Sequence, residues 1–440
     1  MPVRPLTTQI IRDNVKAGAW QEFPLYAHVD NFADETPDKL ATADQHERLS
    51  YAEFVERSKQ LARGLLRLGL DDGDPVLVQG GNRVLVSVAH LACNRANLTY
   101  VPISSAWRQA EMRQLLDLSG ARVAILPEPV KDFDFVETVA AMRSDLPALE
   151  TVVGTGVGSP DDLALNDLFV DGDERVDLRQ DPDAPYFAMA TSGTTDLPHM
   201  SAWTDNNLWF FLSQYRAAVE LSPDDVIVGL APASTGSTGY VFPVLAPLLC
   251  GAGAVLLEHW TPEAALDLIA SEQATGATAI PTQIIKMLSC EERAHLTFPA
   301  MRFFNNAGAA MPPDHARALE ERFGCTVQTV YGATDGGVPV MTRLGDLPQK
   351  RFSTVGKMLP HTEMRLIGGD LEDVPSGERG EIIWRNPTKS FGYINEEDRS
   401  AAAFWEDGWY RSGDLGEIDE DGYLRIVGRA KDLIIRGGQN

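Results

Sequence analysis

Hydrophobic positions in the first half of the chain alternate between helix-like and strand-like spacing. Apolar residues between 54 and 68 recur on one helix face, and Ser50 with Glu53 forms a capping-box pattern at the start of that helix. Short apolar runs of strand character follow at 75–79, 99–103 and 122–126, and a helical stretch at 84–96 separates the first two. This order predicts a mostly parallel sheet with helices on both faces.

The middle of the chain repeats the pattern. Strands are predicted at 226–232, 254–258, 278–281 and 301–308, with helices at 261–274 and 312–324. The longest apolar run, 241–257, is interrupted by Pro243, Pro247, Gly251 and Gly253, so it predicts a buried helix, a turn and a strand. Small residues at strand ends, as in NNAGAA, are typical of ligand binding at the carboxyl edge of a parallel sheet.

The pattern changes near residue 340. Short alternating runs broken by glycine follow, and Asp421-Gly422 between two of them indicates a hairpin. We therefore predict an α/β protein with two parallel-sheet subdomains in an αβαβα arrangement and a small antiparallel, barrel-like β subdomain. The predicted ranges are 1–182, 183–340 and 341–430, and 431–440 would be a hinge that begins a further domain.

Composition narrows the possible functions. The 440 residues include 38 basic and 63 acidic ones, a net charge of -25, which disfavours binding to nucleic acid or to anionic membranes. The four cysteines have no metal-site or disulfide spacing, which is typical of reduced, buried thiols. The first twenty residues carry charges throughout and lack the apolar core of a signal peptide, so we expect a cytoplasmic protein.

Six short motifs carry the candidate chemistry. They are TSGTT at 191–195, NAGAAMP at 306–312, YGATD at 331–335, GYI at 392–394, GWYRSGDLG at 408–416 and GRAKD at 428–432. The first is a glycine- and hydroxyl-rich turn after a strand, which suits phosphate binding. Together and in this order, the motifs resemble those of the ANL superfamily of adenylate-forming enzymes, over nearly the whole chain.

The resemblance implies that ATP activates a carboxylic acid to an acyl-adenylate with release of pyrophosphate. The segments 18–25, 323–332, 342–344 and 428–438 look most like stand-alone aryl-acid AMP ligases. The acyl group would then pass to a phosphopantetheine thiol, of a carrier protein or of CoA. Two alternatives stay open: an acyl- or aryl-CoA synthetase, and a catalytically impaired protein that binds acyl groups or nucleotides.

The resemblance also implies roles for individual residues. Asp335 would hold Mg²⁺, Tyr331 would stack on adenine and Thr334 would contact the α-phosphate. Asp414 would accept hydrogen bonds from the ribose hydroxyls, with Arg429 near the ribose or phosphates. The implied catalytic residues are Thr194, Thr195, Asp335 and Lys431. The nucleotide-binding set adds Thr191, Ser192, Gly193, Gly308, Ala309, Ala310, Tyr331, Gly332, Thr334, Asp414 and Arg429.

The phosphate loop departs from the family pattern. Asp196 and Met200 replace glycines, and His199 replaces a lysine. A free histidine titrates near ~6.5 and is mostly neutral at pH 7, so we expect a weaker grip on the β- and γ-phosphates and a pH sensitivity that follows His199. Either the enzyme works with weakened ATP affinity, which we favour, or activity is lost.

The acyl pocket also departs from known patterns. Residues 230–242 carry neither the aspartate that pairs with α-amino acids nor an asparagine, so the charge of an amino acid would be unpaired. An aromatic or modest aliphatic carboxylic acid fits better. The predicted pocket residues are Phe211, Thr235, Ser237, Thr238, Gly239, Tyr240, Thr282 and Val355.

The chain ends in the middle of the last motif. Lys431 matches the family's hinge, beyond which members continue for a domain that carries a further catalytic lysine. We therefore expect a fragment that lacks this lysine, binds ligands and adenylates weakly.

Overall fold

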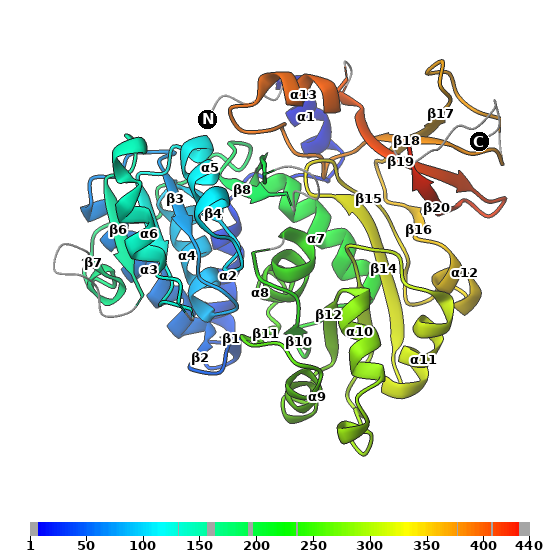
Figure 1. Ribbon diagram of the computed structural model, residues 1–440, viewed down its shortest axis with the longest axis horizontal. Helices are drawn as coiled ribbons and strands as arrows, with labels where there is room; N and C mark the ends of the chain where they lie inside the picture. Colours follow the sequence, from blue (N-terminus) through cyan, green and yellow to red (C-terminus); the bar gives the residue numbers. More distant parts are fainter. Residues whose placement is uncertain are drawn as a thin grey trace.

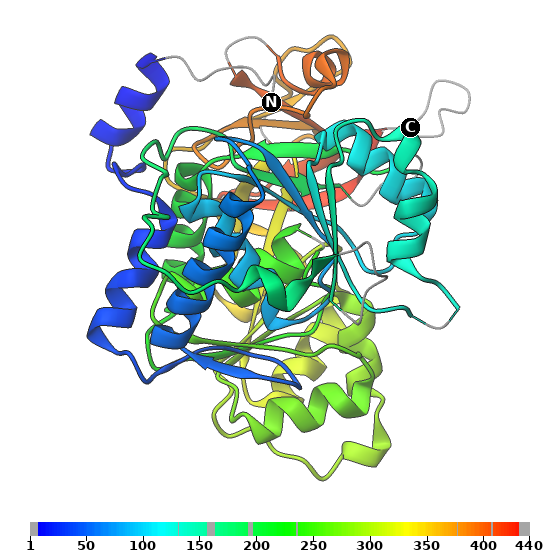
Figure 2. The same cartoon turned by 90° about the vertical axis from the view of Figure 1, so that its left-hand side faces the viewer.

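The computed structural model describes residues 8–130, 132–155, 163–191, 197–234, 236–375, 377–405 and 408–430. Two sheets and their helices form successive layers, with the first half of the chain on one side of Figure 1 and the middle of the chain beside it. Figure 2 shows the same arrangement from the side. The α/β fold predicted from the sequence is confirmed.

The smaller sheet has seven strands, parallel except at one edge. Their order is β7 (Leu163–Ala164), β6 (Thr151–Gly154), β5 (Val123–Leu126), β3 (Pro75–Val78), β4 (Thr99–Pro102), β8 (Phe187–Ala190) and β9 (Met200–Trp203), with β9 antiparallel to β8. Four helices flank the sheet: α3 (Tyr51–Arg67) and α4 (Val84–Arg95) on the inner face, and α5 (Gln109–Ser119) and α6 (Phe135–Ala141) on the outer one. The capping box at Ser50 and Glu53 is present as predicted.

The larger sheet has thirteen strands and changes from parallel to antiparallel at β14. Its order is β17 (Glu363–Ile367), β18 (Gly380–Arg385), β19 (Tyr410–Ile418), β20 (Tyr423–Arg429), β16 (Gly356–Met358), β15 (Gly337–Met341), β14 (Thr326–Ala333), β13 (Phe303–Asn306), β12 (Gly276–Ala279), β10 (Val226–Gly229), β11 (Gly253–Leu256), β1 (Leu40–Ala43) and β2 (Arg48–Ser50). The strands after residue 340 are antiparallel, as predicted, and they extend the sheet from β14. The predicted hairpin joins β19 to β20.

The larger sheet also has helices on both faces. The outer ones are α9 (Pro262–Ser271), α10 (Pro281–Leu288) and α11 (Pro313–Phe323), and the inner ones are α7 (Asp205–Val219), η3 (Ser237–Leu245) and α8 (Ala246–Leu248). The remaining helices are α1 (Thr8–Lys16), α2 (Leu25–Glu35), η1 (Arg143–Asp145), η2 (Leu165–Leu168), η4 (Glu291–Arg293), α12 (Pro348–Ser353) and α13 (Glu397–Ala403).

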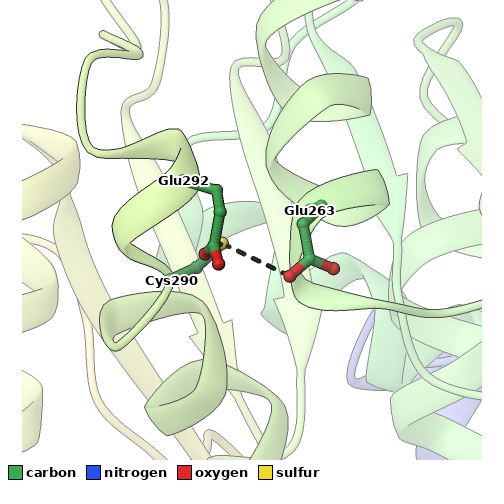
Figure 3. A group of neighbouring side chains, drawn as sticks. All are labelled: Glu263, Cys290 and Glu292. Carbon is green, nitrogen blue, oxygen red and sulfur yellow. Dashed lines mark hydrogen bonds between the residues drawn. The ribbon is translucent and has the colours of Figure 1, made fainter.

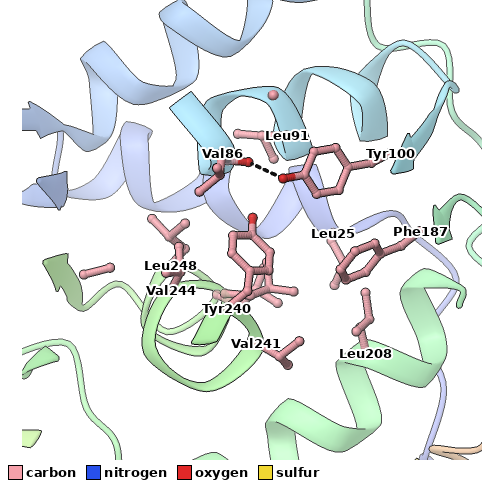
Figure 4. Packing of buried hydrophobic residues seen from close by; sticks show 14 of the residues in the cluster. Leu25, Val86, Leu91, Tyr100, Phe187, Leu208, Tyr240, Val241, Val244 and Leu248 are labelled. Atoms are coloured by element: carbon pink, nitrogen blue, oxygen red, sulfur yellow. Dashed lines mark hydrogen bonds between the residues drawn. The ribbon is translucent and has the colours of Figure 1, made fainter. Parts of the chain in front are cut away.

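One hydrophobic core joins the two sheets. Tyr100 and Phe187 of the smaller sheet pack against Tyr240 of η3 in this core (Figure 4). His90 of α4 lies at its centre, with one ring nitrogen 2.7 Å from the Tyr240 hydroxyl and the other 2.7 Å from that of Tyr186. The core therefore fixes the relative position of the two sheets, whose carboxyl edges carry the site motifs.

Sheet membership crosses the predicted subdomain ranges. β1 and β2 pair into the larger sheet through β11, while β8 and β9 complete the smaller sheet beside β4. A strand joins the sheet whose edge it can hydrogen-bond, which sequence order does not specify. The ranges 1–182, 183–340 and 341–430 stay a prediction, and 431–440 lies outside the described residues.

The apolar run at 241–257 is a buried helix, a turn and a strand, as predicted. The helix η3 is a π-helix with Pro243 inside it, and such wide turns occur often at functional sites. In the part of the chain that the structure describes, no helix has the length and apolar character needed to cross a membrane.

Candidate active site

Several predicted site segments meet where parallel strands end. A methyl group added to Gly308, which follows β13 with a φ of 86°, would lie 3.6 Å from the Thr238 hydroxyl of η3. One added to Gly236 would lie 3.7 Å from the hydroxyl of Thr334, which follows β14. The starts and ends of these elements thus lie within van der Waals reach of one another, and the positive φ angles of Gly236 and Gly308 favour glycine at both positions.

Asp335 lies two residues after the end of β14 and is held by groups from three segments. Its carboxylate accepts hydrogen bonds from the hydroxyls of Tyr393 and Tyr410, the latter at 2.9 Å, and from the backbone N–H of Gly336. The Ser390 hydroxyl donates to the Asp335 carbonyl at 2.5 Å. Burial, and next the Asp335 carboxylate, raise the pKa of both tyrosines, so these hydroxyls remain protonated donors.

Three of about four lone-pair sites on this carboxylate are therefore in use, which leaves one for a hard cation such as Mg²⁺. Asp335 is 8% exposed, so a cation would have to bind at the margin of a largely enclosed group. The donor set fits magnesium in its chemistry. Tyr393 and Tyr410 lie inside the motifs GYI and GWYRSGDLG, but sequence reasoning did not select them.

Asp414 of β19 lies across from Tyr331 of β14. The Tyr331 hydroxyl donates to Asp414 Oδ2 at 2.9 Å, and Arg429 Nε lies 3.1 Å from Oδ1. Burial raises the pKa of the Asp414 carboxyl, an effect that the tyrosine and the arginine oppose. Three residues predicted to contact the nucleotide, from β14, β19 and β20, are thus brought together although β15 and β16 separate β20 from β14 in the sheet.

Four small residues of the same motifs leave their backbone accessible to solvent. Gly308, Ala309, Ala310 and Gly332 are exposed. A methyl group on Gly332 would lie 2.4 Å from the Gly337 carbonyl oxygen, so the β14–β15 turn requires glycine there. A flat ligand can approach the backbone at these positions.

The phosphate loop is described only at its two ends. Thr191 donates its backbone N–H to the His199 carbonyl at 2.7 Å, and its hydroxyl accepts from the His199 N–H, which closes the base of the loop. Ser192, Gly193, Thr194, Thr195 and Asp196 lie outside the described residues.

His199, at the base of the loop, pairs with a residue from a distant segment. Its Nδ1 lies 2.8 Å from a carboxylate oxygen of Glu396, which precedes α13. Its Nε2 is buried and has no hydrogen-bond partner among the described residues. The side chain in the lysine position is therefore committed to a carboxylate, and sequence reasoning had no signal for that partner.

The predicted acyl-pocket residues fall in different environments. Phe211 and Tyr240 are buried in the core between the sheets, Thr282 is exposed on α10, and Val355 packs in the separate cluster that includes Tyr331. Ser237, Thr238 and Gly239 begin η3, and Thr238 lies closest to Gly308. Thr235 and Lys431 lie outside the described residues.

A group of potential metal ligands lies elsewhere. Glu263, Cys290 and Glu292 place one ligand atom each within 4.8 Å of one another (Figure 3). Burial raises the pKa of the Cys290 thiol, the backbone hydrogen bond at Arg293 lowers it, and the two carboxylates raise it further. All four cysteines are free and buried, as predicted.

The chain is similar to known proteins in sequence and in fold. Residues 29–394 match the family model described as AMP-binding enzyme. The salicyl-AMP ligase/salicyl-S-ArCP synthetase of Mycobacterium tuberculosis (strain ATCC 25618 / H37Rv) is 31% identical, covering 96% of this chain and 76% of that protein. The medium-chain fatty-acid–CoA ligase of Escherichia coli (strain K12) is 30% identical, covering 96% and 75%. The crystal structure of ATP-bound MatB from Rhodopseudomonas palustris is 26% identical with a TM-score of 0.85, covering 96% and 81%.

Proposed function

This chain belongs to the AMP-binding enzyme family, and from that premise we propose how its residues activate an acid. The family is adenylate-forming: a carboxylate oxygen attacks the α-phosphorus of ATP, the bond to the bridging oxygen of the β-phosphate breaks, and pyrophosphate leaves. The chain is therefore an ATP-dependent acid–AMP ligase. Such a reaction depends on positioning and charge neutralisation more than on covalent catalysis.

The observation that carries the proposal is the pair of carboxylates held between β14 and β19. The Tyr331 hydroxyl of β14 donates to Asp414 of β19, and the Tyr410 hydroxyl of β19 donates to Asp335, which follows β14. Four positions separate the two residues on each segment. Asp414 would accept the ribose hydroxyls, with Tyr331 against the adenine and Arg429 beside the ribose. The exposed backbone at Gly308, Ala309, Ala310 and Gly332 would form the nucleotide's other wall.

Asp335 would hold Mg²⁺ through the oxygen that Tyr393 leaves partly free. When bound, the ion would neutralise charge on the phosphates of ATP. Thr334 would contact the α-phosphate, and Thr191, Ser192, Gly193, Thr194 and Thr195 would surround the β- and γ-phosphates. Lys431 would serve as the hinge between conformations.

The acid would enter beside Thr238 and Gly239, where η3 begins. We propose an aryl or modest aliphatic carboxylic acid, with Phe211, Thr235, Ser237, Tyr240, Thr282 and Val355 in or around its pocket. The acceptor would be a phosphopantetheine thiol. The salicyl-AMP ligase similarity favours a carrier protein, while the fatty-acid–CoA ligase similarity supports CoA as the second candidate.

ATP–pyrophosphate exchange with a panel of aryl and aliphatic acids, with and without Mg²⁺, tests the proposal. We expect Asp335→Asn to lower exchange at least ~100-fold, since it removes a metal ligand. Asp314→Asn, an exposed aspartate at the start of α11, is the control and should leave exchange unchanged. If none of the acids in the panel supports exchange, the ligase function of this chain is contradicted. If the Asp335 variant keeps full exchange, only the metal role is contradicted.

A further inference from the structure

The turn between β14 and β15 carries Thr334 and Asp335, and side chains from distant segments bind its backbone. Its residues, 334–336, present three successive carbonyl groups. A turn at the surface leaves such carbonyls to water. Here each of the three accepts a hydrogen bond from a protein side chain, so the turn is held along its whole length.

The first carbonyl is held from the smaller sheet. The Trp203 indole N–H and the Ser201 hydroxyl, both on β9, donate to the Thr334 carbonyl at 3.0 Å each. Both side chains are 0% exposed. β9 begins one residue after His199, at the base of the phosphate loop. The strand that ends the phosphate loop therefore also binds the turn that carries the candidate metal ligand.

The next two carbonyls are held from other segments. The Ser390 hydroxyl donates to the Asp335 carbonyl at 2.5 Å, and the Trp384 indole N–H of β18 donates to the Gly336 carbonyl at 2.8 Å. Trp384 is also 0% exposed. A buried indole N–H usually finds a hydrogen-bond partner, and both of these fully buried tryptophans donate to this one turn, from different sheets.

The Trp384 ring has a second contact with the site. It packs against Tyr331 and Tyr410, with ring centroids 5.9 Å and 4.7 Å away. These are the tyrosines whose hydroxyls donate to Asp414 and Asp335. Trp384 therefore supports the turn and both tyrosines that hold the two carboxylates.

Holding a carbonyl oxygen restricts the side chains on either side of it. A peptide group is planar, so a fixed oxygen limits the ψ angle of the residue before it and the φ angle of the residue after it. The Thr334 carbonyl belongs to the peptide group that joins Thr334 to Asp335. The bonds from Trp203 and Ser201 therefore limit the directions in which the Thr334 and Asp335 side chains point.

We propose that Trp203 and Trp384 are positioning residues of the adenylation reaction. They hold the turn from two sheets, so that Thr334 is directed at the α-phosphate and Asp335 at Mg²⁺. This inference rests on the proposed ligase function. Neither indole would touch a ligand itself, and each acts through the turn. A reacting group that is slightly displaced loses rate while the substrates still bind.

Trp203→Phe and Trp384→Phe keep an aromatic ring and remove the indole N–H. In ATP–pyrophosphate exchange, kcat should fall about tenfold in each variant, the factor expected for one lost hydrogen bond, and the KM for the acid should change less than about twofold. Calorimetry of ATP with Mg²⁺ and with EDTA gives a second readout. The gain in ATP affinity due to Mg²⁺ should fall about tenfold, as for other residues that orient a metal ligand.

Trp20→Phe is the matched control. Trp20 is 5% exposed and its indole N–H has no partner among the described residues, so this variant removes the same volume without removing a hydrogen bond. It should keep kcat per folded molecule and the Mg²⁺ gain, even with a lowered melting temperature. Ser201→Ala removes one donor to the Thr334 carbonyl without removing a ring. It should lower kcat about threefold, and it tests the same contact where a tryptophan variant does not fold.

The outcomes separate positioning from a structural role. If the Trp203 and Trp384 variants match Trp20→Phe in kcat per folded molecule and in the Mg²⁺ gain, the two tryptophans have no positioning role, and the wild-type activity still supports the proposed function. If the wild-type chain neither catalyses exchange nor binds ATP with Mg²⁺, the proposed function fails, and the positioning role fails with it.

Discussion

At the scale of single residues, the site depends on hydroxyl groups that hold carboxylates. Tyr393 and Tyr410 restrain Asp335, and Tyr331 restrains Asp414. Because burial raises the pKa of the Asp414 carboxyl, protonation begins at a higher pH than for a free aspartate, near ~3.9. In the proposed role, only the ionised Asp414 carboxylate would accept both ribose hydroxyls. We therefore expect nucleotide binding to weaken on acidification, beginning at a pH above the ordinary aspartate pKa.

The His199–Glu396 pair leads to a prediction about phosphate affinity. Changing His199→Lys alone would place the new ammonium beside Glu396, which would neutralise it. We expect the double variant His199→Lys, Glu396→Gln to bind ATP about tenfold more tightly, because a free cation then reaches the β- and γ-phosphates. AMP affinity should change less than about twofold, since AMP lacks those phosphates.

Isothermal titration of both nucleotides against the wild type, both single variants and the double variant checks this. An equal gain for ATP and AMP would show that the lysine acts elsewhere than on the terminal phosphates.

At the scale of elements, the antiparallel strands must join the parallel ones closely. Gly356 begins β16 with a φ of 105°, and a methyl group there would lie 2.0 Å from the Met341 carbonyl carbon of β15. β16 pairs with both β15 and β20, and β20 ends at Arg429. Arg429 pairs directly with Asp414 between β19 and β20, and β16 joins this hairpin to β15.

We predict that Gly356→Ala lowers the free energy of unfolding by about 2–4 kcal/mol, from the strained φ together with overpacking. Gly345→Ala is the control, because a methyl group there meets nothing within 4 Å. Thermal unfolding of both variants measures the difference. An equal melting temperature for both would contradict the close contact at β15.

At the scale of the whole molecule, the core between the sheets makes a pH-dependent contribution to stability. Burial, with a smaller effect of Arg179, lowers the pKa of His90 to about 3. The unfolded chain binds that proton near pH ~6.5, so the contribution of His90 is complete above that pH and is lost as the pH falls toward the folded value. Protonation would make both ring nitrogens donors, so the tyrosine hydroxyl that donates to the neutral ring would have to accept instead.

Between pH 6.5 and 5.0 the loss due to His90 should be about 1.5 kcal/mol. His90→Gln, whose amide can bond both tyrosines, should flatten this part of the stability profile in denaturant titrations. His259→Gln, at an exposed histidine, should keep the wild-type slope. A wild-type slope in the His90 variant would show that other groups dominate acid unfolding.

The local chemistry of the sequence determined most of the elements. Elements that depend on neighbours a few residues apart can be recognised from the sequence. Examples are the capping box at Ser50, the strands at 75–79 and 226–232 and the hairpin at Asp421-Gly422. The motif order likewise indicated an adenylate-forming enzyme, which the family match confirms. The individual site roles stay predictions.

Only the tertiary structure decided which distant residues meet. Such contacts between segments far apart in sequence are the Glu396 partner of His199, the two tyrosines on Asp335 and the pairing of β1 into the larger sheet. Strand pairing and burial depend on which sheet edges and faces meet when the core packs. Local spacing in the sequence does not specify these long-range contacts. The sequence therefore determined the reaction class, and folding decided which side chains meet at the candidate site.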